Sequence, residues 1–317
     1  PIMNGSKAVP FDTELALLQD DDVTFDRQNI GIVVANTIEQ ARYAAELVQF
    51  KYAAQKPKIV TDLTTASGVF RPDLERDEPY RVLDTNRGDA DSAFQSSDTK
   101  VDETYVTPRE NHNPMEPHAT TAVWNGDKVT VYDSSQGIFA VQARLAHIFC
   151  IPRENVRVVT KFIGGGFGCK SAVWSHVPLT VAAARMARRP VRVTLDRQQT
   201  FGPVGFRPMI AQRVKLGADK HGKLRAIKHE GRMETATFDN FVEYVGMQAR
   251  FLYSCPNVYT SHRLVKSDIG KPTVMRGIGE CTGSFALESA MDELSYKLKM
   301  DPIELRKINY AEIDEHE

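Results

Sequence analysis

Long hydrophobic runs are missing from this sequence of 317 residues. No stretch approaches the roughly 18 consecutive apolar residues that a membrane-spanning helix needs, so we predict no membrane span. An excess of positive charge is missing as well, because 40 Lys and Arg residues stand against 41 Asp and Glu residues. A chain without a basic excess neutralises phosphates poorly, which argues against nucleic acid as a partner. We find no signal peptide, which leaves a cytoplasmic or a periplasmic location open.

Cysteine is scarce and unpaired in the sequence. The four cysteines stand at positions 150, 169, 255 and 281 and form no C-x-x-C pair. This spacing excludes a zinc ribbon and a conventional iron–sulfur ligand run. The nucleophile motif G-x-S-x-G is absent too, and the eight histidines are scattered without an evident Ser or Cys partner. A hydrolase with a catalytic triad is therefore unsupported.

The apolar content is that of a globular chain. Apolar residues make up 42% of the sequence and charged residues 26%, which is typical of a soluble protein with a core, and the length suits about two domains. Residues 30–35 predict a buried strand, and residues 37–52 predict an amphipathic helix that begins with a capping box at Thr37. Regular periodicity is lost from residue 64 to residue 100, so we assign a linker and a domain boundary there.

The rest of the chain carries a denser pattern of strands and helices. We predict strands at 101–107, 120–124, 128–133, 156–160, 191–195, 213–216 and 224–231, helices at 139–149, 173–186 and 284–298, and a last short helix after Asp301-Pro302. A strand, a Gly-rich turn, a helix and a strand in succession favour a mixed or parallel sheet with helices on its faces. The sequence predicts an α+β (mixed α/β) fold.

Four glycines crowd into five positions of the run Gly164-Gly165-Gly166-Phe167-Gly168, between a predicted strand and a predicted helix. Such a loop lets the backbone approach a bulky ligand and exposes N–H donors, and the next helix adds the positive end of its dipole. The run is neither a Walker A loop nor a G-x-G-x-x-G fingerprint. On glycine content alone it is equally consistent with a tight strand-to-helix turn.

Two further polar residues stand beside turns. Gln136 follows a predicted strand in Ser134-Ser135-Gln136, where a solvated amide is the plain alternative to a ligand contact. Arg276 lies between Met275 and Gly277, in a turn that can present a guanidinium to a carboxylate or phosphate. A surface arginine is the commoner outcome for such a residue.

A third group consists of metal-ligating residue types. His112, Glu116 and His118 lie close together in a segment stiffened by two prolines. Their spacing matches no zinc motif, and polar side chains in such a segment commonly bond the backbone instead. We therefore prefer a structural turn over a metal site.

Taken in order, these motifs resemble a known family. They are Pro114-Met115-Glu116-Pro117-His118, Ser134-Ser135-Gln136, Gly164 to Lys170, Met275-Arg276-Gly277 and the helix from Phe285 to Leu294. The succession is similar to the molybdopterin-binding (large) subunit of the xanthine dehydrogenase/aldehyde oxidoreductase family, above all to the bacterial three-subunit aldehyde oxidoreductases. The resemblance implies the end of an α/β hammerhead domain at 1–66, a linker at 67–97, and the first molybdopterin-binding domain at 98–317.

The resemblance also implies roles for single residues. Gln136 matches the family's glutamine that hydrogen-bonds an apical ligand of the molybdenum, and Arg276 matches the arginine on the other side of the cofactor. Both are catalytic candidates on this ground. The implied cofactor-binding residues are Gln136, Gly165, Gly166, Phe167, Gly168, Arg276, Gly277 and Ile278. No side chain of this chain is implied as a direct metal ligand.

An activity follows from the same resemblance. It implies oxidation of aldehydes to carboxylic acids with water-derived oxygen at a molybdopterin cofactor, in the cytosine dinucleotide form. It implies that electrons pass to 2Fe-2S clusters and FAD on an iron–sulfur subunit and a FAD subunit. Ser171 stands where purine-oxidising members have glutamate, and residues 268–275 lack the cysteine of carbon monoxide dehydrogenases, so a small aldehyde is the expected substrate. Hydroxylation of an N-heteroaromatic ring, or a non-catalytic binding or scaffold protein, are the alternatives.

Some parts of the site are expected outside this chain. The family's general-base glutamate lies near the C-terminal end of the full subunit, and Glu280 does not take that role. Much of the cofactor's nucleotide end is held by the same C-terminal half. A lone strand at 30–35 would also leave unpaired edges. We therefore expect the remaining parts of the subunit, before Pro1 and after Glu317, in the same polypeptide or in a separate chain.

Overall fold

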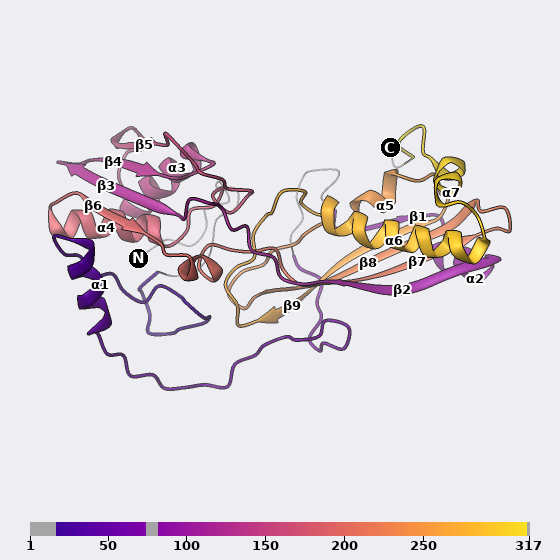
Figure 1. Cartoon of the computed structure of the whole chain (residues 1–317), viewed down its shortest axis with the longest axis horizontal. Coiled ribbons are helices and arrows are strands. Elements are labelled where there is room, and N and C mark those ends of the chain that lie inside the picture. Colours follow the sequence, from indigo (N-terminus) through magenta and orange to yellow (C-terminus); the bar gives the residue numbers. More distant parts are fainter. Residues whose placement is uncertain (1–16, 74–81, 316–317) are drawn as a thin grey trace.

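The computed structural model describes residues 17–73 and 82–315, which form an elongated molecule with one β-sheet toward each end (Figure 1). The larger sheet has the strand order β1-β9-β8-β7-β2 and the smaller sheet the order β5-β4-β3-β6. The strands are β1 (Asp84–Arg87), β2 (Thr99–Thr107), β3 (Ala119–Asn125), β4 (Lys128–Asp133), β5 (Val156–Val159), β6 (Val191–Thr194), β7 (Ile210–Ala218), β8 (Leu224–Ala236) and β9 (Val258–Ser267). The helices are α1 (Ile38–Glu46), α2 (Ala90–Gln95), α3 (Ile138–Phe149), α4 (His176–Ala187), α5 (Met247–Phe251), α6 (Glu280–Leu298) and α7 (Pro302–Asn309).

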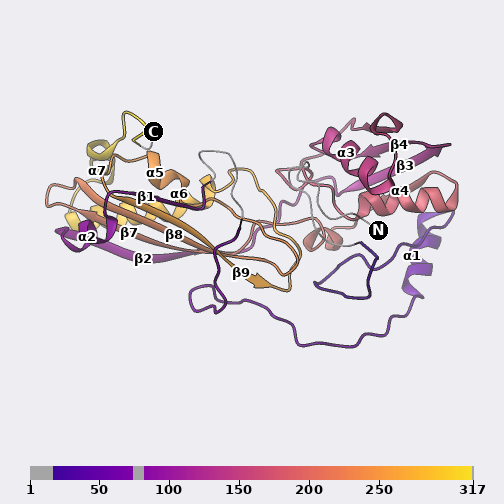
Figure 2. The ribbon, with the colours of Figure 1, turned by 180° about the vertical axis from the view of Figure 1, so that it is seen from behind.

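The five-stranded sheet has helices on both faces. Val214 and Leu216 of β7 belong to the core that includes Leu287 of α6, while Lys215 between them lies over the ring of Phe94 in α2. Because successive residues of a strand point to opposite faces, α2 and α6 lie on opposite sides of the sheet. The long helix α6 crosses the front of the sheet in Figure 1 and lies behind its strands in Figure 2. The pair β8–β9 is parallel, and the other pairs of this sheet are antiparallel.

The four-stranded sheet contains a parallel crossover. Strands β4 and β5 pair in parallel and are connected through α3, whereas β3 pairs antiparallel with both β4 and β6. Val141 of α3 and Val181 of α4 join one hydrophobic core with Ala122 and Val131 of the sheet. A mixed sheet with helices packed on it is what the sequence predicts, and the α+β fold class is confirmed.

Two segments carry the chain between the sheets. Residues 108–118 connect β2 to β3, and residues 195–209 connect β6 back to β7. They meet at an isolated β-bridge between Glu110 and Arg207. The predicted motif from Pro114 to His118 therefore lies on a connection between the two sheets.

The start of α7 follows the local sequence signals closely. Asp301 accepts hydrogen bonds from the backbone N–H groups of Ile303 and Glu304, and Pro302 is the first residue of α7, as predicted. The helix predicted at 284–298 starts four residues earlier, at Glu280, directly after Gly279 with φ of 79°. Its first turn therefore directly follows residues 275–279, the turn that contains Arg276, which we call the arginine turn.

The prediction of a buried strand at 30–35 is wrong. These residues form no strand, and none of them is buried. Strands β1–β9 of the described chain offer them no partner, and an unpaired strand leaves its backbone groups unsatisfied. The helix begins at its predicted cap, where Thr37 accepts from the N–H of Gln40, but it ends at Glu46 and contains no buried residue. The predicted extension to Tyr52 would have required something to pack against.

The assignment of residues 67–97 as a linker also needs correction. This range contains β1, which pairs with β9, and α2, which packs on β7 and β8. Both elements are too short to show a periodic pattern, and β9 was not among the predicted strands. Residues 1–16 of the predicted hammerhead segment and residues 74–81 of the predicted linker lie outside the described residues.

Candidate cofactor site

The glycine loop, residues 164–168, follows β5 and adopts a backbone conformation that only glycine accepts easily. Gly164, Gly165 and Gly168 have φ of 52°, 90° and 110°, and Phe167 has φ of 53°. The backbone N–H groups of residues 165–167 donate to none of the described residues, and the Phe167 ring is 46% exposed. The loop thus presents free donors and an apolar ring to whatever lies against it.

The Gln136 side chain holds this loop. Its Oε1 accepts hydrogen bonds from the N–H groups of Gly168 and Lys170, at 3.0 and 3.2 Å. Its own backbone N–H donates to the carbonyl of Lys170 at 2.8 Å. A Cβ at Gly166 would overlap the Gln136 side chain, so glycine is needed there for this approach.

The orientation of the Gln136 amide follows from these contacts. Both partners of Oε1 are N–H donors, so the oxygen has to face the loop and the Nε2 group has to face away from it. Gln136 is exposed, and no described residue accepts from its Nε2. The site therefore keeps one amide donor for a ligand.

Lys170 anchors the same loop from below. Its side chain is buried, and its Nζ donates to the carbonyls of Glu116 and Ile163 at 2.9 and 2.5 Å. Burial lowers the pKa of Lys170, and the Glu116 carboxylate, 3.9 Å from Nζ, opposes this shift. The ammonium is used inside the protein, so it does not face a ligand.

The two histidines of the proline-rich segment bond the backbone. His112 Nε2 lies 2.8 Å from the carbonyl of Val274, and His118 Nε2 lies 3.4 Å from that of Cys169. Burial lowers the pKa of His118 to about 4. Within the described residues, no three His, Cys, Asp or Glu side chains are grouped so that they could hold a metal ion. Both histidine side chains thus bond the backbone, as polar side chains in such a turn commonly do.

The arginine turn lies against the glycine loop. The backbone N–H of Arg276 donates to the carbonyl of Phe167 at 2.9 Å, and a Cβ at Gly168 would overlap the carbonyl of Val274. Gly277, with φ of 77°, lets the chain turn directly after Arg276. The predicted residues from both motifs are thus brought together by the fold, although more than 100 positions separate them in the sequence.

The Arg276 side chain itself is available. It is exposed, and its guanidinium has no hydrogen-bond or ion-pair partner among the described residues. Ile278, the last residue of the predicted set, is partly buried in the turn. The turn therefore offers one positive charge beside the free N–H groups of the glycine loop.

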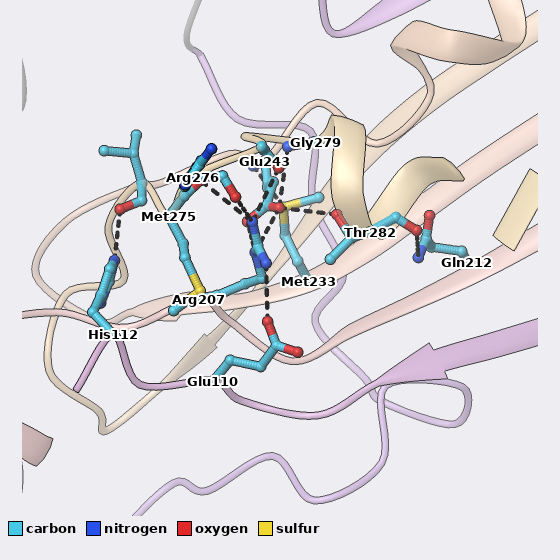
Figure 3. A network of polar contacts seen from close by, with 12 residues as sticks. Glu110, His112, Arg207, Gln212, Met233, Glu243, Met275, Arg276, Gly279 and Thr282 are labelled. Carbon is cyan, nitrogen blue, oxygen red and sulfur yellow. Dashed lines mark hydrogen bonds and ion pairs between the residues drawn. The ribbon is translucent and has the colours of Figure 1, made fainter. Parts of the chain in front are cut away.

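The residues that support this turn carry no motif in the sequence (Figure 3). Arg207, only 2% exposed, places its Nη2 within 3.3, 3.1 and 3.0 Å of the carbonyls of Met275, Arg276 and Gly277. Its Nε pairs with Glu243 at 3.0 Å, and its Nη1 pairs with Glu110 at 2.9 Å.

The carboxylate of Glu243 faces the other end of the turn. Its Oε1 accepts from the N–H of Gly279 and the hydroxyl of Thr282 at 3.1 and 2.9 Å. Burial raises the pKa of Glu243, and Arg207 partly offsets this shift. No sequence signal marks these two residues, because the chain between them and the turn is long and carries no motif.

The donor set suits a large anionic group. The loop and the turn that meet at the hydrogen bond between Arg276 and Phe167 carry free backbone N–H groups, one amide donor and one unpaired guanidinium, while the buried ionic side chains that support them are already paired. A pterin with phosphate groups would find a close backbone approach, hydrogen-bond donors and a compensating charge here. The residues present therefore fit such a cofactor.

Comparison with known sequences agrees with this geometry. The pattern of the molybdopterin cofactor-binding domain matches residues 74–310. The chain belongs to this family. It is 41% identical over 291 residues to the aldehyde oxidoreductase molybdenum-binding subunit PaoC of Escherichia coli O157:H7, a match that covers 90% of the chain and 38% of that subunit.

Other relatives extend the comparison. The chain is 32% identical to a subunit of a probable xanthine dehydrogenase from Bacillus subtilis, over 92% of the chain and 40% of that protein. The aldehyde oxidoreductase of Desulfovibrio gigas has the same fold, with a TM-score of 0.76 and 27% identity, over 87% of the chain and 31% of that structure. The molybdopterin-binding chain thus spans about two fifths or less of the length of these relatives. In its described part, no helix is long and apolar enough to cross a bilayer.

Proposed function

We propose that this molybdopterin-binding chain is part of a molybdenum hydroxylase that oxidises aldehydes to carboxylic acids. The 41% identity with an aldehyde oxidoreductase subunit is the observation that carries the proposal. The reaction is RCHO + H2O → RCOOH + 2 H⁺ + 2 e⁻, with the new oxygen taken from water. The two electrons leave through 2Fe-2S clusters and FAD on an iron–sulfur subunit and a FAD subunit.

The chain's own residues would hold the cofactor from two sides. When bound, the molybdenum cofactor supplies the two-electron oxidant and the centre of oxygen transfer. Gln136 Nε2, which has no described acceptor, would donate to an acceptor atom near the metal. The free N–H groups of Gly165, Gly166 and Phe167 would lie against the pterin, and Gly168 would keep the loop on the arginine turn.

The arginine turn would supply the positive side of the site. The Arg276 guanidinium would face negative charge on the cofactor or on the reacting substrate, and Gly277 and Ile278 would present their backbone beside it. Preorganised donors and charges of this kind stabilise developing negative charge without reorganising during the reaction. No residue of this chain is assigned the general base, which we place in the remaining part of the subunit.

Two details of the cofactor and assembly belong to the same proposal. We infer the cytosine dinucleotide form of the cofactor and a complex with the C-terminal half of the molybdenum subunit, in the same polypeptide or as a separate chain. The hammerhead assignment of residues 1–66 is part of it as well, and we infer that the first molybdopterin-binding domain begins before residue 98, because β1 and α2 belong to its larger sheet. A small aldehyde is the expected substrate.

The first test is made on the native complex. Elemental analysis should find about one molybdenum per copy of this chain, together with iron, and intact-mass measurement should find the partner chains. Turnover of benzaldehyde in ¹⁸O-labelled water, with a dye as electron acceptor, should place one labelled oxygen in the benzoate. A complex that contains no molybdenum, or a benzoate without label from the water, would exclude this function.

A further inference from the structure

We propose that Arg207 is a positioning residue that fixes the arginine turn and thereby aims the Arg276 side chain at the cofactor. This inference rests on the proposed function, because it assigns Arg207 to the same site. Arg207 touches neither the free donors of the glycine loop nor the exposed guanidinium of Arg276, so it acts only through the backbone that it holds.

The contacts of Arg207 are concentrated on the turn. A single nitrogen, Nη2, lies within 3.3 Å of three successive carbonyl oxygens, those of Met275, Arg276 and Gly277. The positive charge favours all three carbonyls pointing inward, which leaves the Arg276 N–H free to bond Phe167 and its side chain free to point outward. The planar guanidinium can reach these oxygens and two carboxylates at once because its donors form a rigid fork.

The two carboxylates keep Arg207 in place. Glu243 is fully buried and binds Nε of Arg207 while it accepts from Gly279 N–H, two residues beyond Gly277. Glu110 binds Nη1 from the segment that joins the two sheets. Positive and negative members of one buried pair therefore hold the turn at both of its ends (Figure 3). Gly277 and Gly279, with φ of 77° and 79°, make the tight path between them possible.

An arginine network of this kind can also be purely structural, and the described part of the molecule contains a more exposed example, in which the arginine side chain is 27% exposed. Arg306 of α7 pairs with Glu288 and Asp292, and it also donates to the carbonyls of Pro302 and Glu288. It has the same kinds of partners as Arg207, but they belong to α6 and α7, and none lies in the glycine loop or the arginine turn. Arg306→Lys is therefore the control for losing an arginine network without touching the site.

The experiment compares Arg207→Lys and Arg306→Lys in the complete complex. A lysine keeps the charge but loses the fork, so it cannot hold the three carbonyls and both carboxylates. We expect Arg207→Lys to lower kcat/KM for benzaldehyde per bound molybdenum about 10- to 100-fold and to alter the Mo(V) electron paramagnetic resonance signal. The control should leave both unchanged, and it should lose less thermal stability than Arg207→Lys, because its ion pairs are more exposed.

Each outcome decides the matter. Equal activity per molybdenum and an unchanged resonance signal in Arg207→Lys would overturn the positioning role. If this variant yields no soluble complex, Glu110→Gln replaces it, because that change removes one partially exposed partner and leaves the Arg207–Glu243 pair. A three- to tenfold loss per molybdenum in Glu110→Gln supports the role, and wild-type values overturn it. A wild-type complex without molybdenum would instead disprove the proposed function itself.

Discussion

The glycine loop and the arginine turn meet at one hydrogen bond, but they are held by different forces. The glycine loop is fastened by neutral hydrogen bonds from its N–H groups to the exposed amide oxygen of Gln136, and by the buried ammonium of Lys170. The arginine turn is fastened by a buried ion pair between Arg207 and Glu243. One half of the site depends on backbone shape, and the other depends on charge buried beneath it.

Because of this difference, the glycine loop and the arginine turn should tolerate different substitutions. A buried ion pair is costly to break on one side, because the remaining charge is left without a partner. A loop built on glycines is instead sensitive to any added Cβ, since its backbone occupies conformations that other residues resist. Substitutions on the two sides should therefore fail for different reasons, and each can be measured separately.

The largest effect is expected from Gly168→Ala. Gly168 has φ of 110°, and an added Cβ would overlap the carbonyl of Val274, which cannot move away as a side chain could. Strain of this kind costs about 1–3 kcal/mol, and the overlap would also push the loop off the arginine turn. We expect most of the molybdenum to be lost from the purified complex, as measured by elemental analysis.

Gly126→Ala provides the matched control for this change. Gly126 also has a positive φ, of 59°, but an added Cβ would meet no atom within 4 Å. This turn between β3 and β4 should lose about 1 kcal/mol of stability and no molybdenum. The view that close approach matters more than backbone strain fails if both variants lose molybdenum alike.

A somewhat smaller effect is expected from Gln136→Glu. The carboxylate can still accept from the N–H groups of Gly168 and Lys170, so the loop should stay in place. The free Nε2 donor disappears, and a donor lost from a preorganised site commonly costs about 100- to 1000-fold in rate. We expect kcat/KM to fall about 100-fold, with the melting temperature within about 2 °C of wild type. A fall in kcat/KM that is accompanied by a melting temperature well below that of wild type would show that Gln136 only supports the loop.

The same two halves show what the sequence can predict. Glycines at 164–168 carry their conformational requirement within a few residues, so the loop and its place between strand and helix were predictable. Asp301-Pro302 and Thr37 are equally local signals, and both caps form as predicted. The order of the motifs supplied the family resemblance, which the comparisons confirm.

The features that were not predicted depend on contacts between residues far apart in the sequence. Arg207 contacts carbonyls 68 to 70 positions away and a carboxylate 36 positions away, so no local spacing marks it. Strand β1 has four residues and pairs with β9, about 175 positions further on. The error at 30–35 has the opposite origin, because a local apolar pattern was taken as a strand where the described chain supplies no neighbouring strand.

The smallest expected effect at neutral pH is a change in stability caused by His262, which bonds the chain segment that follows Glu243. His262 is fully buried, its Nδ1 lies 2.6 Å from the carbonyl of Leu83, and its Nε2 accepts from the N–H of Gly246. Burial lowers the pKa of His262 to about 4. Gly246 ends the segment that begins with Glu243, so this histidine and the buried ion pair hold neighbouring parts of one chain segment.

Protonation of His262 should loosen that segment in acid. Its folded-state pKa of about 4 lies below the value of about 6.5 in the unfolded chain, so the stability it provides is complete above pH 6.5 and is lost as the pH falls toward 4. At pH 5 this loss is about 2 kcal/mol, since the unfolded chain binds the proton that the native site refuses. Thermal unfolding of the complex at pH 7 and pH 5 measures this loss as a difference in melting temperature. We expect His262→Gln to reduce that difference. The control His221→Gln, at an exposed position, should leave it unchanged. If both variants reduce this difference in melting temperature equally, the acid sensitivity does not come from His262. The segment beside the buried Arg207–Glu243 pair is then not stabilised by the neutral imidazole of His262.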